Sequence, residues 1–220
     1  MKRTITSTYR LQLRGPHADP EGREFGFAQA AELVPYLADL GVSHLYLSPI
    51  FASAPESNHN YDVIDPTVVN PELGGIDGLR LLSRAAHEAG LGLIVDIVPN
   101  HLGVENPRAN RWWWDVLKHG RGSDYASYFD IDWDEDNGAG GRIGLPVLGS
   151  PGDTAALALA HRDGEDVLTY HEHVFPLAPG SYASLDDDPE AVHDRQHYRL
   201  MYWRDGVISY RRFFSVNGLA

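Results

Sequence analysis

The stretch Ile94-Val95-Asp96-Ile97-Val98-Pro99-Asn100-His101-Leu102-Gly103 begins as an apolar run and then changes abruptly to Asp, Asn and His. A strand buried on both faces of a parallel sheet is apolar throughout, and the polar residues at its C-terminal end point into the loops where active sites are built. The stretch therefore predicts a buried parallel strand with a site at its end, and Asp96 and His101 are the first candidates. A strand, a proline turn and a helix-capping asparagine form the alternative interpretation.

Strand-like and helix-like segments alternate through the first hundred residues. We predict strands over 6–13, 42–47 and 91–98 and helices over 27–40 and 77–89. Apolar residues recur at three- and four-residue spacings in the helical segments, and Gly41 and Gly90 mark their ends. This alternation is typical of a parallel sheet with right-handed crossovers. The long connection 48–75 is rich in Pro, Asn and Ser, and we expect it to carry functional residues.

The alternation stops after His101. Residues 104–220 show short segments and many turn signals, with one expected helix over 107–118 that carries three tryptophans, 112–114. Successive helix positions point about 100° apart, so we expect one or two of these tryptophans to pack in the core. The predicted fold class is α/β. Residues 1–103 are the first three βα units of a (β/α)8 TIM barrel, and residues 104–220 are a large mixed insertion after strand three.

Three strands cannot close a barrel, because closure needs about eight strands of consistent tilt. We therefore expect this chain to be incomplete as a catalytic barrel. The residues from 210 to 220 stop in mid-pattern, which favours the same interpretation. Either a second polypeptide carries the remaining strands, or the chain is a shortened form of a longer protein.

The charge balance excludes several classes of partner. The 220 residues contain 31 Asp and Glu against 18 Lys and Arg, which gives a net charge of −13. Such a chain repels nucleic acid and anionic membranes, and it favours a neutral or cationic ligand. The absence of cysteine removes thiol catalysis, thiolate metal sites and disulfides. No apolar segment resembles a signal peptide or a membrane span, so we expect a cytoplasmic protein.

Two motifs suggest metal sites, and neither is complete. Three aspartates alternate as at the start of an EF-hand loop: Asp132, Asp134 and Asp136. Asn137 stands where that loop needs glycine, and Ile143 stands where it needs a bidentate glutamate. His171 and His173 are expected on one strand face, but two ligands are too few for zinc. We predict no metal and no cofactor.

Several blocks of the sequence resemble the alpha-amylase superfamily. They are YRLQL (9–13), VSHLYLSPI (42–50), HNYDVIDP (59–66) and DIVPNH (96–101). Further blocks resemble one branch of it, the maltooligosyltrehalose synthase family: WWDVL (113–117), YFDIDW (128–133), LPVLG (145–149), YRL (198–200) and YRRFF (210–214). Two positions depart from the family pattern. Asn60 replaces a usual glycine before Tyr61, and Ser215 replaces a common aspartate.

This resemblance implies an intramolecular transglycosylase acting on maltooligosaccharides. Such an enzyme converts the reducing-end α-1,4 linkage into an α,α-1,1 linkage, which leaves a trehalose-ended chain. Retaining chemistry of this kind needs a carboxylate nucleophile and a carboxyl acid/base about 5–5.5 Å apart. In family order both lie beyond residue 220, so the isolated chain is expected to be inactive. The insertion is expected to exclude water from the cleft.

The resemblance also implies roles for individual residues. His59 and His101 would donate hydrogen bonds to the sugar in the cleavage subsite, and Tyr61 would stack beneath its ring. Asp62 would bind a sugar hydroxyl. Asp96 would orient a neighbouring arginine and the nucleophile, both of which lie beyond residue 220 in family order. Gln12 would line the floor of the same subsite.

Two other functions remain open at this point. One is plain hydrolysis of α-glucans, which would use the same sugar-contacting residues, and the other is a non-catalytic glucan-binding fragment. The insertion blocks favour the transglycosylase over the hydrolase, because the two activities differ in how water is kept from the acceptor subsite.

Overall fold

The computed structural model describes residues 4–205 and 210–211, and the chain divides into two compact units, Met1–Gly103 and Val104–Ala220. Ser215, one of the two departures from the family pattern, lies outside the described residues. Within the described part of the chain, no helix has the length and apolar character needed to cross a membrane.

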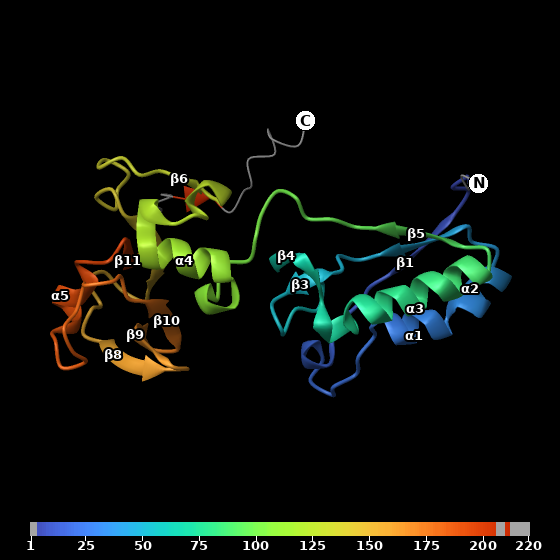
Figure 1. Ribbon diagram of the computed structural model, residues 1–220, viewed down its shortest axis with the longest axis horizontal. Coiled ribbons are helices and arrows are strands. Elements are labelled where there is room, and N and C mark those ends of the chain that lie inside the picture. The colour runs from blue at the N-terminus through green and yellow to red at the C-terminus, as the bar shows by residue number, and fades with distance from the viewer. Residues whose placement is uncertain (1–3, 206–209, 212–220) are drawn as a thin grey trace. The chain divides into compact units, whose positions relative to one another are not determined.

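The first unit is built on a three-stranded parallel sheet. Its strands, in the order in which they pair, are β1 (Thr8–Leu11), β2 (His44–Leu47) and β5 (Gly92–Val95). The helices that connect them are α1 (Phe27–Glu32), α2 (Val34–Asp39) and α3 (Gly75–Glu88). Figure 1 shows these helices together on one side of the strands. Sequential parallel strands with helical crossovers on one side form the start of a βα layer architecture.

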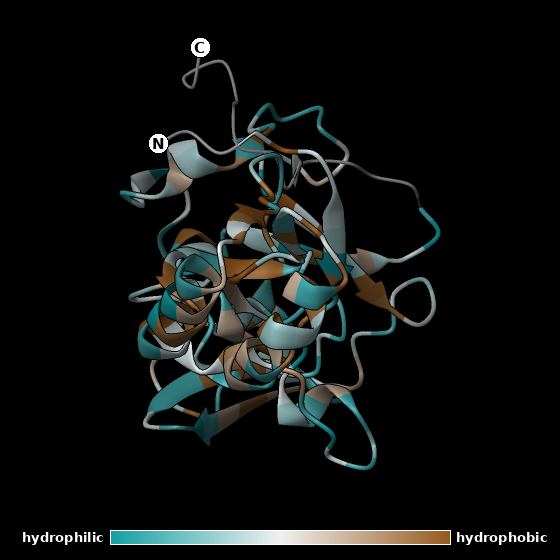
Figure 2. Cartoon of the chain, turned by 90° about the vertical axis from the view of Figure 1, so that its right-hand side faces the viewer, coloured by the Kyte–Doolittle hydropathy of each residue, from teal (hydrophilic) through white to brown (hydrophobic). Residues whose placement is uncertain are grey.

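Side chains alternate between the two faces of this sheet, and the helices cover only one face. The covered face carries Leu11, Leu13, Leu45 and Leu47, all of which are buried in the core with side chains from α1, α2 and α3. Each fully buried leucine contributes about 1.5–3 kcal/mol through the hydrophobic effect. The alternate positions belong to the opposite face, which is where Arg10 and its register partner Tyr46 lie. Figure 2 shows the hydrophobic colour on several strands and on parts of the helices, while many loops are hydrophilic.

The predicted single helix over 27–40 is wrong, because the segment forms two helices that meet at Leu33. Pro35 lies in the first turn of α2. A proline has no N–H to donate and its ring clashes with the carbonyl four residues earlier, so it is tolerated in a first turn but not inside a helix. The predicted ends at Gly41 and Gly90 are confirmed, since both glycines have positive φ, 84° and 80°.

The connection 48–75 contains a hairpin that the sequence did not reveal. Strands β3 (Phe51–Ser53) and β4 (Val63–Val69) pair antiparallel, with two register irregularities within three residues of β3. A strand this short and this irregular shows no alternating pattern that could be recognised. Short 3-10 turns lie at Pro16–Ala18 and Pro71–Leu73. After β5 the chain runs to Gly103 without a further helix in this unit.

The second unit has mixed structure, as predicted. Its helices are α4 (Arg111–His119) and α5 (Pro189–His193), with 3-10 turns at Pro107–Ala109, Gly120–Gly122 and Ala126–Tyr128. Its strands form an antiparallel sheet of β8 (Leu157–Arg162), β9 (Glu165–Tyr170) and β10 (His173–Pro176), a parallel pair of β7 (Ile143–Leu148) and β11 (Tyr198–Tyr202), and an antiparallel pair of β6 (Asp130–Ile131) and β12 (Tyr210–Arg211).

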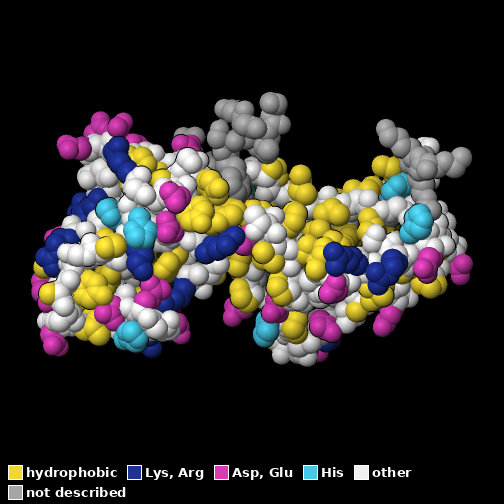
Figure 3. Space-filling model, viewed as in Figure 1, with side chains coloured by type: hydrophobic (Ala, Val, Ile, Leu, Met, Phe, Trp, Pro, Cys, Tyr) yellow, Lys and Arg dark blue, Asp and Glu magenta, His cyan; other side chains and the backbone are white. Residues whose placement is uncertain are grey.

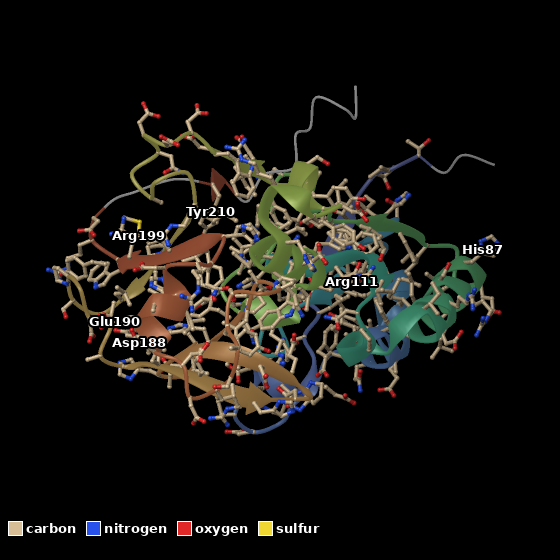
Figure 4. The ribbon with its side chains drawn as sticks, turned by 60° about the vertical axis from the view of Figure 1, so that its left-hand side comes forward. His87, Arg111, Asp188, Glu190, Arg199 and Tyr210 are labelled. Atoms are coloured by element: carbon tan, nitrogen blue, oxygen red, sulfur yellow. The ribbon has the colours of Figure 1, made fainter. Side chains whose placement is uncertain are left out.

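Side chains of α4 and the cap of α5 explain part of this local structure. Trp112 and Trp113 are buried, at 7% and 0% exposure, which confirms that part of the tryptophan run packs in the core. Trp114 instead lies beneath the guanidinium of Arg108, 5.0 Å from its ring centroid. Asp188 caps α5 by accepting a hydrogen bond from the Ala191 backbone, and Figure 4 labels it at the start of that helix.

Candidate functional site

Two segments that are far apart in the sequence lie against each other next to the sheet. The Nε2 atom of His101 is 2.9 Å from the Tyr61 carbonyl oxygen, and the Gly103 N–H donates to the Val63 carbonyl at 2.7 Å. A Cβ at Gly103 would stand 2.9 Å from the Asp62 carbonyl oxygen, so only glycine allows this approach. The structure therefore brings together the two motifs that the sequence singled out.

The carboxylate of Asp96 is the centre of this region. Its Oδ2 atom accepts hydrogen bonds from the hydroxyl groups of Tyr61 and Tyr46, the latter at 3.2 Å. The guanidinium of Arg10 is 3.5 Å from the same oxygen, and its Nη2 atom donates to the Tyr61 hydroxyl at 2.9 Å. Arg10 also lies over the ring of Tyr46, 4.8 Å from the centroid. These four side chains come from all three strand ends and from the 48–75 connection.

The contacts within this group shift the acidity of its members. Partial burial alone would raise the pKa of Asp96, but hydrogen bonds from Tyr61, Tyr46 and Arg10 together lower that pKa below its usual value. The hydrogen bond to Asp96 raises the pKa of Tyr61. Asp96 is therefore a carboxylate, and Tyr61 a neutral phenol, at neutral pH. The site presents one fixed negative charge beside one fixed positive charge.

The remaining predicted residues surround this centre. The amide of Gln12 donates to the Asn58 carbonyl at 3.2 Å, and its oxygen is 3.5 Å from Arg10. His59 accepts from the Tyr61 backbone at 2.9 Å, with the two rings 6.0 Å apart. Asp62 is the outlying member, because its carboxylate accepts from the Ser57 hydroxyl at 2.5 Å and lies 3.9 Å from His59.

Sequence reasoning missed Arg10 and Tyr46. Both lie within blocks that resemble the family, at positions for which the resemblance implies no role. The available signal was a charged side chain inside a strand whose neighbours Leu11 and Leu13 are buried, because a charge there has to face away from the helices. Arg10 also lies two positions before Gln12, which puts both on one face of the strand.

The conformation of Asn60 explains how an asparagine can stand where the family usually has glycine. Its φ is 62°, and it is buried at 1% exposure. Asparagine tolerates this left-handed conformation better than other residues with a side chain. Its amide donates to the Leu13 carbonyl at 2.8 Å and accepts from the Ser53 hydroxyl at 2.8 Å, while its backbone N–H donates to Ser57 at 2.9 Å. The asparagine thus keeps the glycine-like turn before Tyr61 and adds hydrogen bonds that fix it.

The two segments that carry incomplete metal motifs, 132–143 and 171–173, do not form metal sites among the described residues. Among the described residues, no three His, Cys, Asp or Glu side chains are placed to hold an ion. Asn137 closes the acidic turn by donating to the carbonyls of Asp132 and Arg142 at 2.8 and 2.9 Å. The expectation that His171 and His173 share a strand face is wrong, because His171 has a φ of 51° in the turn before β10.

A hollow of about 600 Å³ lies in the second unit and contains none of the predicted site residues. Its charged side chains are paired with one another or with neighbours. Glu165 bridges Lys118 and Arg108, at 3.1 Å each, and Asp166 bridges His161 and Tyr182. Because these groups satisfy each other, we place the candidate site at Asp96 and not in this hollow. Figure 3 shows basic side chains interspersed with acidic ones on the viewed surface, without a continuous basic patch.

Comparison with known proteins shows the family of this chain. Residues 19–147 match the family model described as "Alpha amylase, catalytic domain". A Mycobacterium tuberculosis protein that bears the name maltooligosyl trehalose synthase is 56% identical over 216 residues, which is 98% of this chain and 26% of that protein. The solved maltooligosyltrehalose synthase from Arthrobacter ramosus is 52% identical with a TM-score of 0.81, and the match covers 96% of this chain and 26% of that one.

An intracellular maltogenic amylase of Bacillus subtilis is 40% identical over 116 residues, which cover 51% of this chain and 19% of that enzyme. This chain thus spans about a quarter of the length of the synthases that it matches. The family model covers more than half of the 220 residues, and Tyr46, Tyr61 and Asp96 lie within the matched region. The chain belongs to the alpha-amylase family.

Proposed function

We propose that this chain is the N-terminal part of an intramolecular transglycosylase that forms maltooligosyltrehalose from maltooligosaccharides. The observation that carries the proposal is the convergence of Arg10, Tyr46 and Tyr61 on the Asp96 carboxylate, on the sheet face that the helices leave uncovered. In a (β/α)8 barrel this face lines the interior, and the C-terminal strand ends carry the active site. We infer that residues 1–103 begin such a barrel and that residues 104–220 are inserted after its third strand.

In the proposed reaction, a carboxylate nucleophile attacks the anomeric carbon of the penultimate glucose while a carboxylic acid protonates the leaving oxygen of the reducing-end glucose. The freed glucose stays bound and turns. Its anomeric hydroxyl then attacks the glycosyl-enzyme and gives its proton to the same acid/base residue, which restores the nucleophile. No water is consumed. We propose that the nucleophile and the acid/base lie on strands outside these 220 residues.

Within this scheme, the described residues bind and orient the sugar. Tyr61 provides a ring for stacking, and the ring of His59 lies 6.0 Å from it. Gln12 and the Tyr61 hydroxyl both contact Nη2 of Arg10, so we propose that Gln12 and His59 contact the same sugar. Asp96 orients cationic and carboxylate neighbours. The Tyr61 carbonyl can only accept, so Nε2 of His101 donates to it at 2.9 Å. In the neutral ring Nδ1 is then an acceptor, so a hydrogen bond between His101 and the sugar would have a sugar hydroxyl as its donor.

The extent of the sequence match supports isomerisation over hydrolysis. The amylase match covers about half of this chain, whereas the synthase matches cover at least 96% and so include the second unit. A second unit shared with synthases is suited to shield the glycosyl-enzyme from water, which decides between the two outcomes.

Replacing His101 with alanine in the full-length enzyme is expected to lower kcat/KM for maltopentaose on the order of 10²-fold, because it removes a preorganised hydrogen-bonding group and its contact with the Tyr61 backbone. The variant should remain folded. Steady-state kinetics with a circular dichroism control provide the measurement, and near wild-type turnover would remove His101 from the site.

A second experiment tests the proposal that the nucleophile and the acid/base lie outside these 220 residues. The purified 220-residue chain is expected to give no trehalose-ended product from maltopentaose, because it lacks the two proposed carboxylates. Conversion should appear when the remaining strands are supplied, either in one longer chain or as a second polypeptide. Product analysis by chromatography distinguishes the outcomes, and conversion by the 220-residue chain alone would refute this division.

A further inference from the structure

Arg10 occupies an unusual position for a charged side chain. It belongs to β1, and its neighbour Leu11 is buried in the core, yet the Arg10 side chain is 37% exposed on the opposite face. The face of Tyr46 supports its guanidinium at 4.8 Å, while Nη2 points to Tyr61 and Nη1 to Asp96. One rigid, planar group thus contacts three of the side chains at the site.

The hydroxyl proton of Tyr61 is committed to Asp96 within this arrangement. A phenol has one proton to donate, and Tyr61 donates it to Oδ2 of Asp96. The hydroxyl oxygen of Tyr61 in turn accepts a hydrogen bond from Arg10 at 2.9 Å. Tyr61 therefore has no proton left to donate to a ligand, whereas the face of its ring is not used by these two hydrogen bonds.

The two oxygens of the Asp96 carboxylate have different surroundings. Tyr61, Tyr46 and Arg10 all contact Oδ2. None of the described residues forms a side-chain hydrogen bond or ion pair with Oδ1. Asp96 consequently has one oxygen committed to the protein and one that can accept a hydrogen bond from outside.

We propose that Arg10 is a positioning residue that clamps the Tyr61 hydroxyl against Asp96, so that the site presents the ring face of Tyr61 and the Oδ1 atom of Asp96 to the sugar. This inference rests on the proposed function for its ligand, and on the hydrogen bonds alone for its geometry. A stacking surface held at a fixed tilt loses less entropy on binding a pyranose ring than a mobile one, so the clamp favours affinity and orientation.

The experiment compares Arg10→Gln, Arg10→Lys and the control Arg80→Gln in the full-length protein. Arg80 is an exposed arginine on α3 that pairs only with Asp77 in the described structure. Carbon-13 NMR of labelled aspartate and tyrosine reports the titration of Asp96 and the ring signals of Tyr61 without substrate. Kinetics with maltopentaose report the effect on the reaction.

In Arg10→Gln, we expect the pKa of Asp96 to rise, the ring signals of Tyr61 to shift, and kcat/KM to fall by about tenfold. Arg10→Lys keeps the positive charge but cannot contact Tyr61 and Asp96 at the same time as a guanidinium does. The pKa of Asp96 should therefore return closer to its wild-type value than the ring signals of Tyr61 do. Arg80→Gln should match the wild type in all three measurements. In a Tyr61→Phe background, Arg10→Gln should lower kcat/KM by less than tenfold, because the hydroxyl group that Arg10 holds is already absent.

Unchanged Asp96 titration and unchanged Tyr61 signals in Arg10→Gln would overturn the clamp, even if the enzyme makes the expected product. Changed NMR signals in an enzyme that does not act on maltooligosaccharides would leave the clamp supported and refute the proposed function. Equal losses from Arg10→Gln in the presence and absence of the Tyr61 hydroxyl would also overturn the clamp.

Discussion

Replacing Asp96 with alanine in the full-length enzyme is expected to lower kcat/KM for maltooligosaccharides by about 10³-fold. The substitution removes the acceptor of two tyrosine hydroxyls and leaves the guanidinium of Arg10 without its carboxylate partner. It also removes the charge that we propose to orient the nucleophile. Asp96→Asn should be nearly as harmful, because the amide keeps the shape of the carboxylate but not its charge. Steady-state kinetics with maltopentaose provide the measurement.

The matched control is Asp77→Ala, which removes an exposed carboxylate from the first turn of α3. It should leave kcat/KM unchanged. A fall of less than tenfold in Asp96→Ala would show that the hydrogen-bonded cluster serves the fold and not the reaction.

The stability contributed by Asp96 should depend on pH in a defined direction. Its pKa is lowered in the folded protein, so the stabilising contribution is fully present above the ordinary carboxyl pKa of about 3.9. It is lost as the pH falls through the lowered value. The difference in unfolding free energy between the wild type and Asp96→Asn should therefore be constant near neutral pH and shrink only in acid.

Asn60→Ala is expected to reduce the free energy of unfolding by about 3–4 kcal/mol. Alanine cannot replace the amide that donates to the Leu13 carbonyl and accepts from Ser53, so buried polar groups lose their partners. It also fits less well at a φ of 62°. Because Asn60 immediately precedes Tyr61, the loss should reach the stacking ring as well. Urea unfolding followed by circular dichroism measures the change.

Two further variants separate the causes. Asn60→Gly relieves the backbone strain but not the lost hydrogen bonds, and should cost about 2 kcal/mol. His171→Ala is the matched control, because His171 has a φ of 51° but is exposed, and among the described residues it contacts the ring of Tyr170 without a side-chain hydrogen bond. It should cost about 1 kcal/mol or less. Equal effects of alanine at positions 60 and 171 would mean that the buried amide contributes nothing.

Much of the site was predictable because its residues follow strands. Asp96 and His101 come directly after an apolar run, so the end of that run marked them without any knowledge of the other strands. Tyr61 and His59 were found only through the resemblance of their block to a family. Arg10 was missed because a single charge in a strand does not show what it will face, and its partner Asp96 is 86 residues away.

By itself, the sequence determined the parallel strands with helical crossovers and the change of pattern after His101, since these depend on local periodicity and on which side chains avoid water. Tertiary structure alone decided the hairpin in the 48–75 connection, the left-handed turn at Asn60 and the grouping of Arg10, Tyr46 and Tyr61 around one carboxylate oxygen. Each of these depends on hydrogen bonds between residues that are distant in the sequence. Such bonds have no periodic signature, because their geometry exists only after the strands have paired.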